Sequence, residues 1–201
     1  MEYILGSGSP RRKELLAALG ISFRIQKAEG EEKRVGDTPA QIVENLSRQK
    51  AMEVAQEYCE NISKEGVCII GADTLVAKEN AILGKPKDEE DAMKMLELLS
   101  GTNHQVYTGV TVVCVVDGEK TAFSFHEKTE VFFSQMESEE RKEYVYGKTS
   151  MLGNWRDKAG GYGIQEPFGM RYIKRIEGDY NNVVGLPVAR LYQELSVRGF
   201  L

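Results

Sequence analysis

Residues 7–12 read Ser-Gly-Ser-Pro-Arg-Arg, and this run of small and basic residues is typical of a phosphate-binding loop. Ser9 is a suitable helix N-cap, and Pro10 has the backbone angle favoured at the first helical position. The helix that begins here would present free N–H groups and a positive dipole end to an anion, and Arg11 and Arg12 would add guanidinium donors. The alternative is an ordinary capped surface helix whose arginines are solvated.

A carboxylate, Asp73, interrupts the apolar run over residues 67–76. The continuous apolar character of this run predicts a central strand that is buried on both faces. Because an unpaired carboxylate inside a protein is costly, we expect Asp73 to face a cation, a metal ion or a wet cleft. An aspartate that caps a turn is the alternative.

A lysine lies on an otherwise apolar helical face. Residues 38–41 form a Thr-Pro-Ala-Gln capping box, which predicts a long helix over about 39–58. Lys50 shares one stripe of this helix with three apolar residues, namely Val43, Leu46 and Val54. Its ammonium group either extends to the rim of the apolar face or reaches an anion held between the helix and the sheet.

Two later segments add candidates for ligand contact. The chain turns at residues 78–80 and returns as a hairpin, which would bring Lys85 near the carboxylate of the interrupted strand. The glycines within residues 157–165 permit positive φ angles or close backbone approach, so this segment could bend around a ligand with Lys158 and Gln165 on its walls. A loop without a ligand is the alternative for the second segment.

The expected elements alternate between strand and helix, which predicts the α/β class. Strands are expected at residues 2–6, 22–27, 67–76, 104–116, 119–133 and 170–176. Helices are expected at residues 10–19, 39–58, 88–99 and 137–146, and a terminal helix from Pro187. The dipeptide Asp117-Gly118 predicts a hairpin between the two longest strands. Because no repeat or linker interrupts this order, we expect one domain over residues 1–201.

The composition excludes several classes of protein. The 201 residues are 41% hydrophobic and carry a formal net charge of −5, which permits a sizeable core and argues against a nucleic-acid partner. Cys59, Cys68 and Cys114 lack metal-binding spacing, so we expect buried, inert thiols in a reducing, cytoplasmic compartment. No apolar run approaches the roughly 20 residues that cross a bilayer, so no membrane partner is expected.

A series of motifs, taken in order, resembles the Maf family of nucleoside triphosphate pyrophosphatases. The motifs are SGSPRRKELL, GEEK, RQKA, GADTLV, LGKP, LSGTNHQVYTGV, DKAGGYGIQ and IEGDYNNVVGLP. The resemblance implies an elongated α/β protein in which helices flank a mixed, twisted sheet and an active cleft lies between two lobes. It also implies that water cleaves a nucleoside triphosphate into a monophosphate and pyrophosphate, with a divalent cation, magnesium or manganese.

The resemblance also implies roles for individual residues. Asp73 matches the family's proton acceptor, and Glu31, in GEEK, matches an acidic residue near the metal ion. The positions that match phosphate-handling residues are Ser7, Arg11, Arg12, Lys50 and Lys85, and those that match further substrate-binding positions are Asp157 and Lys158. A hard cation with oxygen ligands would bridge the triphosphate to the two carboxylates, and the basic residues would neutralise the remaining charge.

The family has a branch resembling dTTP/UTP pyrophosphatases and a branch resembling 7-methyl-GTP pyrophosphatases. Arg11, Thr74 and Gln165 fit the first branch. The chemistry is consistent, because a glutamine amide can donate to O4 and accept from N3–H of uracil or thymine. Two departures from the family pattern are the Gly-Asn-Trp-Arg segment at residues 153–156 and Glu166, whose charge beside Gln165 is expected to loosen base specificity.

We therefore expect an enzyme that hydrolyses nucleoside triphosphates, dTTP and UTP above all. A 7-methyl-GTP pyrophosphatase is the alternative within the family, and a regulator of cell division that senses nucleotides without turnover is the alternative from another class. Exposed apolar strand faces would permit a homodimer, although no feature of the sequence requires one.

Overall fold

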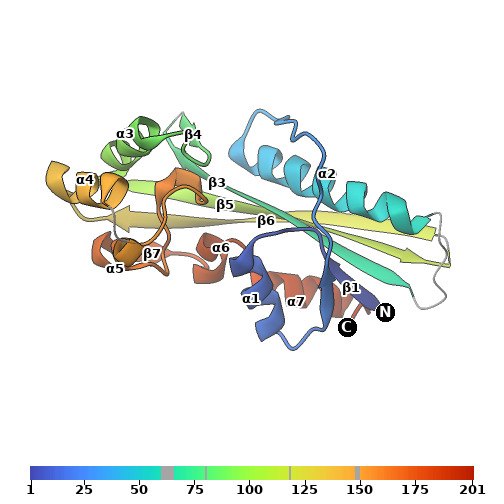
Figure 1. Cartoon of the computed structure of the whole chain (residues 1–201). Helices are drawn as coiled ribbons and strands as arrows, with labels where there is room; N and C mark the ends of the chain where they lie inside the picture. Colours follow the sequence, from blue (N-terminus) through green and yellow to red (C-terminus); the bar gives the residue numbers. More distant parts are fainter. Residues whose placement is uncertain (60–65, 80, 118, 148–149) are drawn as a thin grey trace. The chain divides into compact units, whose positions relative to one another are not determined.

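The computed structural model describes residues 1–59, 66–79, 81–117, 119–147 and 150–201, and it confirms the α/β class (Figure 1). Over these residues, seven strands form a mixed sheet in the order β2-β1-β3-β5-β6-β7, with β4 paired to β3. The strands are β1 (Glu2–Leu5), β2 (Phe23–Ile25), β3 (Val67–Lys78), β4 (Ala81–Leu83), β5 (Asn103–Val116), β6 (Glu119–Phe133) and β7 (Ile173–Glu177). β1 is parallel to β2 and β3, whereas the pairs β3–β4 and β6–β7 are antiparallel.

Helices flank the sheet, as expected for this class. They are α1 (Pro10–Ala18), α2 (Pro39–Cys59), α3 (Glu89–Leu99), α4 (Ser138–Tyr146), α5 (Pro167–Tyr172), α6 (Tyr180–Val184) and α7 (Val188–Val197), with short 3-10 turns η1 (Ser150–Leu152) and η2 (Ala159–Gly161). The predicted capping box of α2 is confirmed, because the Gln41 N–H donates to Thr38 Oγ1 and the Thr38 N–H donates to Gln41 Oε1, each at 3.3 Å.

The strand expected over residues 170–176 is wrong in its first half. The chain there continues α5, which begins at Pro167 directly after the extended residue Glu166. Phe168 and Tyr172 of α5 are buried four residues apart, which is the spacing of one helical face rather than of a strand. The chain becomes extended only at Ile173, where β7 pairs with β6. Helix α6 is a further element that the sequence pattern does not predict.

Three predictions concern residues outside the described ones. Asn80, from the expected turn at residues 78–80, and Gly118, from the expected hairpin dipeptide, lie outside the described residues, as does the side chain of Cys59. The other two thiols, Cys68 and Cys114, are buried as expected. In the described ranges, no helix combines the length and the apolar character that a membrane span requires.

The described chain divides into two compact units. The first unit consists of Met1–Asp73, Thr108–Glu127 and Gly185–Leu201, and the second consists of Thr74–Tyr107 and Lys128–Val184. Strands β3, β5 and β6 contribute residues to both units.

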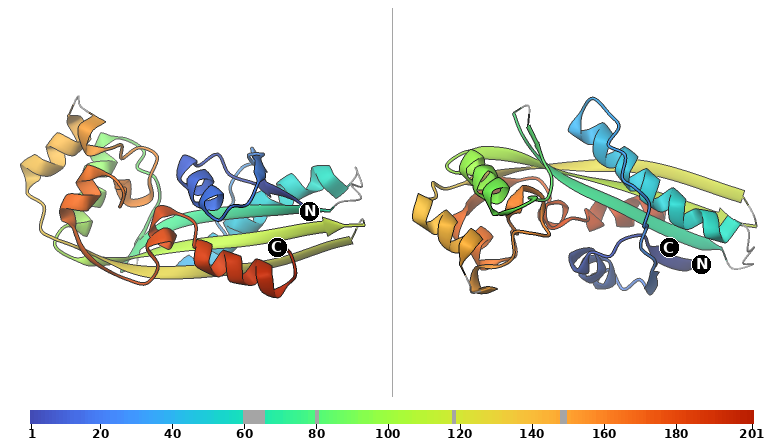
Figure 2. Two further views of the ribbon diagram at one scale, coloured as in Figure 1. Left: turned by 90° about the horizontal axis from the view of Figure 1, so that it is seen from below. Right: turned by 45° about the horizontal axis from the view of Figure 1, so that its top comes forward.

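In the first unit, alternate residues of β3 pack into different layers. Val67 and Ile69 pack with residues of α2, whereas Cys68 and Ile70 pack with residues of α1 and α7. Figure 2 shows α2 on one side of these strands and α7 on the other. Burial on both faces confirms the central strand that the apolar run predicts.

Helix α2 lies directly on Gly71 of β3. A Cβ atom at this position would lie 2.5 Å from the Ser47 carbonyl oxygen and 2.8 Å from the Ala51 nitrogen, which are backbone atoms of α2. Side chains alternate along a strand, so Asp73 emerges on the same face as Gly71. The close contact between helix and strand therefore brings the carboxylate next to α2.

In the second unit, helices α3, α4 and α5 gather around the beginning of β5 and the end of β6 (Figure 2). Leu96 and Leu99 of α3, Phe133 of β6 and Phe168 of α5 belong to one buried apolar cluster. Trp155, from the segment that departs from the family pattern, is also part of this cluster, and its indole N–H donates to the Val145 carbonyl at 3.1 Å. This core supports the loops that carry the remaining candidate residues.

Candidate functional site

Asp73 and Lys50 form an ion pair in the first unit. The Lys50 ammonium, from α2, lies 2.5 Å from Asp73 Oδ1, and the two side chains are only 16% and 14% exposed. Asp73 thus faces a cation, as expected, and Lys50 reaches an anionic group rather than merely extending along the helix. Because both groups keep some access to solvent, an arriving ligand can exchange partners with either of them.

A second carboxylate, that of Glu32, shares the same ammonium. Glu32 Oε1 lies 2.9 Å from Lys50 Nζ, and the Glu32 side chain is 54% exposed. Glu31, the acidic residue that the family resemblance implies, is exposed next to it. The structure therefore brings Glu32 to the Asp73–Lys50 pair. Sequence reasoning missed this residue because GEEK contains two adjacent acids and does not indicate which of them contacts the lysine.

The segment that carries Glu32 is held along α2 by polar side chains spaced four residues apart. Asn45 Nδ2 donates to the Val35 carbonyl at 2.8 Å, Gln49 Oε1 accepts from the Lys33 N–H at 3.0 Å, and Glu53 Oε1 accepts from the N–H groups of Glu29 and Gly30 at 2.7 and 2.9 Å. This spacing places the three side chains on one face of the helix. The row of side chains 45, 49 and 53 is a signal from which the docking of the segment could have been inferred.

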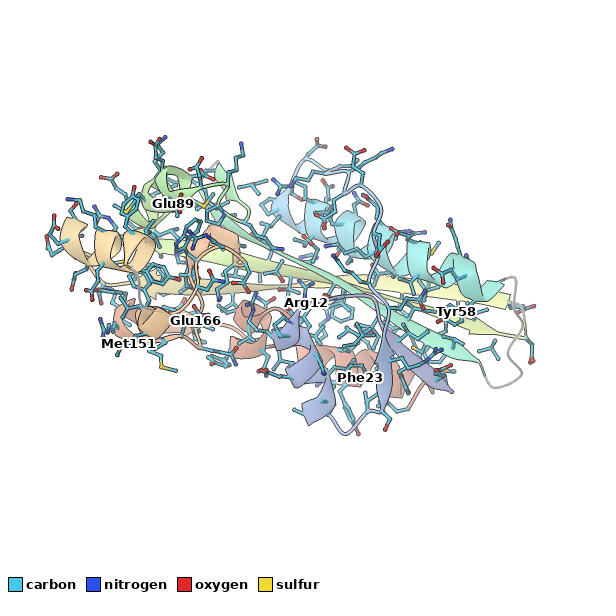
Figure 3. The ribbon with its side chains drawn as sticks, in the orientation of Figure 1. Arg12, Phe23, Tyr58, Glu89, Met151 and Glu166 are labelled. Carbon is cyan, nitrogen blue, oxygen red and sulfur yellow. The ribbon has the colours of Figure 1, made fainter. Side chains whose placement is uncertain are left out.

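Arg12 connects the start of α1 to β3 and to the beginning of the C-terminal segment. The Arg12 side chain is labelled in Figure 3. Its guanidinium donates to the hydroxyl of Ser7 at 3.1 Å, to the Ala72 carbonyl at 2.8 Å and to the Gly185 carbonyl at 2.9 Å. Burial lowers the pKa of Arg12 below its ordinary value, and the negative charge of Asp73 acts in the opposite direction. Ser9 caps α1 as predicted, since its hydroxyl accepts from the Arg12 N–H at 3.5 Å.

In the second unit, Lys158 is buried and its ammonium group is held by three oxygen atoms. The acceptors are the Asn154 carbonyl at 2.7 Å, Asp157 Oδ1 at 2.7 Å and Glu166 Oε1 at 2.6 Å. Glu166 is thus paired with a cation, although the sequence suggests only an added negative charge beside Gln165. Gln165 itself is exposed.

The glycine loop is tied to the segment that carries Lys85. The Gly160 N–H donates to the Gly84 carbonyl at 3.0 Å, next to the exposed Lys85. Gly160 has a φ of 71°, which confirms the positive φ that the glycine density predicts. Tyr162, further along the loop, has its hydroxyl 2.6 Å from His104 Nε2. Within the second unit, the segment that carries Lys85 and the glycine loop therefore lie next to each other.

The candidate residues divide between the units. Ser7, Arg11, Arg12, Glu31, Lys50 and Asp73 belong to the first unit, whereas Thr74, Lys85, Asp157, Lys158 and Gln165 belong to the second. The expected approach of Lys85 to Asp73 stays a prediction.

The carboxylates beside Lys50 are the candidates for binding a divalent cation. Among the described residues, no group of three or more histidine, cysteine, aspartate or glutamate side chains is arranged to hold a metal ion. Magnesium is nevertheless often bound by one or two carboxylates, with water and substrate phosphates completing its shell. Asp73 and Glu32 meet this lower requirement, since both lie within 2.9 Å of one ammonium group.

Comparisons with known proteins identify the family of the chain. A family model described as Maf-like protein matches residues 2–198. A protein of Agathobacter rectalis named dTTP/UTP pyrophosphatase is 50% identical over 206 residues, which cover 98% of either chain. Proteins with the same name from Lachnoclostridium phytofermentans and Bacillus cereus (strain G9842) are 46% and 47% identical over 98% and 96% of this chain, and over 95% and 93% of their own. Because these matches span almost the whole sequence, the chain belongs to the Maf family.

Proposed function

We propose that this protein hydrolyses nucleoside triphosphates, dTTP and UTP above all, to the monophosphate and pyrophosphate. The relatives named dTTP/UTP pyrophosphatase support this proposal, because they are 46–50% identical over nearly full length. The observation that carries it is the partly exposed ion pair between Asp73 and Lys50, whose charged groups lie 2.5 Å apart. In this pair Asp73 can accept a proton and Lys50 can bind phosphate.

In the proposed reaction, Asp73 orients a water molecule and accepts its proton. The oxygen of the water bonds to the phosphorus nearest the sugar, the bond from that phosphorus to the next bridging oxygen breaks, and pyrophosphate leaves with the electron pair. Lys50 exchanges its carboxylate partners for phosphate oxygens as the triphosphate arrives. Its charge then stabilises the negative charge that develops on the phosphates, and so does that of Arg12.

We propose that Asp73 and Glu32 hold a magnesium or manganese ion, with Glu31 as the neighbouring acid implied by the resemblance. When bound, the ion would neutralise part of the triphosphate charge. Further proposed phosphate and substrate contacts, which rest on the family resemblance, are those of Ser7, Arg11, Lys85, Asp157 and Lys158.

Preference for uracil and thymine is the finer part of the proposal. It is supported by Arg11, Thr74 and Gln165, which fit the thymidine/uridine branch, and by the exposure of Gln165 on its loop. We also propose that residues 1–201 act as one domain, because the family model spans residues 2–198. A cytoplasmic location and a homodimer stay predictions from the sequence.

Turnover by the purified protein tests the proposal. We expect pyrophosphate release from UTP and dTTP with magnesium, and slower release from 7-methyl-GTP. Asp73→Asn should lower kcat about 1000-fold, because it removes the proton acceptor. The variant should still bind UTP, which calorimetry can measure.

Two results would contradict the proposal. Faster turnover of 7-methyl-GTP than of UTP would overturn the base preference. Tight nucleotide binding by the parent protein without any pyrophosphate release would overturn the enzymatic activity and favour the nucleotide sensor.

A further inference from the structure

The two segments that depart from the family pattern contact each other in the second unit. Glu166 Oε2 accepts from the Asn154 N–H at 3.0 Å, while Glu166 Oε1 lies 2.6 Å from the Lys158 ammonium. The Lys158 side chain is 6% exposed and that of Glu166 is 25% exposed, so this ion pair is largely shielded from water. A shielded pair with additional hydrogen bonds is held in one geometry more firmly than a surface pair.

The backbone around the pair leaves room for it through two glycines. A Cβ atom at Gly153 would lie 2.1 Å from Glu166 Oε2, and one at Gly163 would lie 2.6 Å from Lys158 Cε. Gly153 also has a φ of 108°, which side-chain-bearing residues rarely adopt. Both departures are therefore parts of one packed arrangement.

This arrangement closes the loop that carries Gln165. Lys158 stands at the start of the loop and Glu166 at its end, so their contact joins the two ends of residues 158–166. Tyr162 fixes the middle of the loop through its hydroxyl, 2.6 Å from His104 Nε2. Gln165 directly precedes Glu166, whose side chain is held by Lys158 and Asn154. The backbone on the C-terminal side of Gln165, which determines where its amide points, is therefore fixed.

A fixed amide matters for telling uracil from cytosine. One orientation of a glutamine amide donates to O4 and accepts from N3–H of uracil, but the orientation turned by 180° donates to N3 and accepts from the amino group of cytosine. An amide that turns freely would therefore accept both bases. Selectivity between them requires the protein to hold the amide in one orientation.

We propose that Lys158 and Glu166 form a positioning pair that fixes Gln165 for the selection of uracil and thymine over cytosine. The inference rests on the proposed function for the identity of the base. It gives Lys158 a role in holding the loop, because three internal oxygens accept from its ammonium group.

The test measures binding selectivity separately from turnover. Calorimetry with magnesium compares non-hydrolysable α,β-methylene analogues of UTP and CTP on the wild type, Glu166→Gln, Gln165→Ala and the double variant. Glu166→Gln should lower the preference for the UTP analogue about tenfold, the effect of one well-made hydrogen bond. Gln165→Ala should lower it similarly, and the double variant should show no further loss, because Glu166 acts through Gln165.

Glu89→Gln is the matched control, because Glu89 pairs with Arg156 at 2.7 Å on the surface of the same unit. It should leave the preference within about twofold, as expected for an exposed pair. If Glu166→Gln does not fold, Glu166→Asp keeps the charge, shortens its reach and should give a smaller loss in the same direction.

An unchanged preference in folded Glu166→Gln would overturn the inference, and so would additive losses in the double variant or a wild type that binds neither analogue. The turnover assay separates this inference from the proposed function. A wild type that binds the UTP analogue selectively but releases no pyrophosphate would contradict the enzymatic activity while leaving the positioning pair in place.

Discussion

The two units each contain a lysine between two carboxylates, and the two arrangements differ in how open they are. Lys50 contacts Asp73 and Glu32 and is 16% exposed, and Glu32 is 54% exposed. Lys158 contacts Asp157 and Glu166, is 6% exposed and also donates to a backbone carbonyl. A lysine, an aspartate and a glutamate therefore form an ion cluster accessible to a ligand in the first unit. In the second unit the same three residue types form a shielded cluster that holds a loop.

The difference follows from the elements that carry the residues. Asp73 and Lys50 extend from a central strand and a long helix, whose backbones are already fixed by the core, so their charges are available to a ligand. Lys158 and Glu166 lie in a loop, and much of their interaction is used to order that loop. We therefore propose that the first cluster carries the chemistry and that the second shapes the loop that presents Gln165.

The largest effect is expected from forcing α2 away from β3. In Gly71→Ala the new Cβ atom would meet backbone atoms of Ser47 and Ala51 at 2.5 and 2.8 Å, and a backbone cannot move aside as a flexible side chain can. We expect a loss of about 3 kcal/mol in the free energy of unfolding, typical of overpacking. Urea unfolding measures this loss.

Gly8→Ala is the control for this prediction. Its Cβ atom would contact only the side chain of Lys27, at 3.4 Å or more, so the free energy of unfolding should change by less than about 1 kcal/mol. Equal losses in Gly71→Ala and Gly8→Ala would mean that the contact between α2 and β3 does not set the geometry of the first cluster.

The next effect distinguishes the two acids of the GEEK motif. Glu32→Gln removes a charge that lies 2.9 Å from Lys50, so we expect kcat for UTP to fall about 100-fold, equivalent to about 2.7 kcal/mol of transition-state stabilisation. Glu31→Gln should have a smaller effect, because the carboxylate that contacts Lys50 is that of Glu32. Steady-state kinetics over a range of magnesium concentrations measures both variants. A larger loss in Glu31→Gln would restore the residue that the family resemblance implies.

The features that could be predicted from the sequence have local signals. The cap of α1 and the capping box of α2 depend on residues within four positions of each other, and both are present in the structure. The pairing of Asp73 was predictable in kind, because an acid inside an apolar run is expected to face a cation, a metal ion or a wet cleft. The identity of that cation was not, since it depends on how α2 lies on Gly71.

The features that could not be predicted depend on contacts between segments distant in the sequence. The contact of Glu32 with Lys50 depends on side chains of α2, which hold the backbone of residues 29–35 along the helix. Residues 170–172 are helical because α5 begins at Pro167 and packs its Phe168 into the core. Glu166 is interpretable only with Lys158 beside it, and the interval between them gives no hint that they pair.

The smallest expected effect is the loss of stability at acid pH through His104, the buried residue that contacts Tyr162 of the glycine loop. His104 is buried, its Nε2 lies 2.6 Å from the Tyr162 hydroxyl, and its Nδ1 has no hydrogen-bond partner among the described residues. Burial, together with the positive charge of Lys78, lowers the pKa of His104 to about 3. The neutral imidazole is thus the form that fits the second unit.

The sign of the pH dependence follows from this shift. The pKa of histidine is about 6.5 in the unfolded chain and is lower in the folded protein, so the contribution of His104 is complete above about pH 6.5 and is lost as the pH falls toward 3. At pH 5 the loss amounts to about 2 kcal/mol, since each pKa unit corresponds to about 1.4 kcal/mol. His104→Gln, which keeps a hydrogen-bonding group without titrating, should lack this part of the acid sensitivity. The control His126→Gln, at a half-buried residue of the other unit, should retain it. Urea unfolding at pH 7 and pH 5 gives the comparison, and equal acid sensitivity in wild type and His104→Gln would show that the anchor of the loop does not titrate. Mild acid should therefore weaken the packing that holds Tyr162 and the loop of residues 158–166.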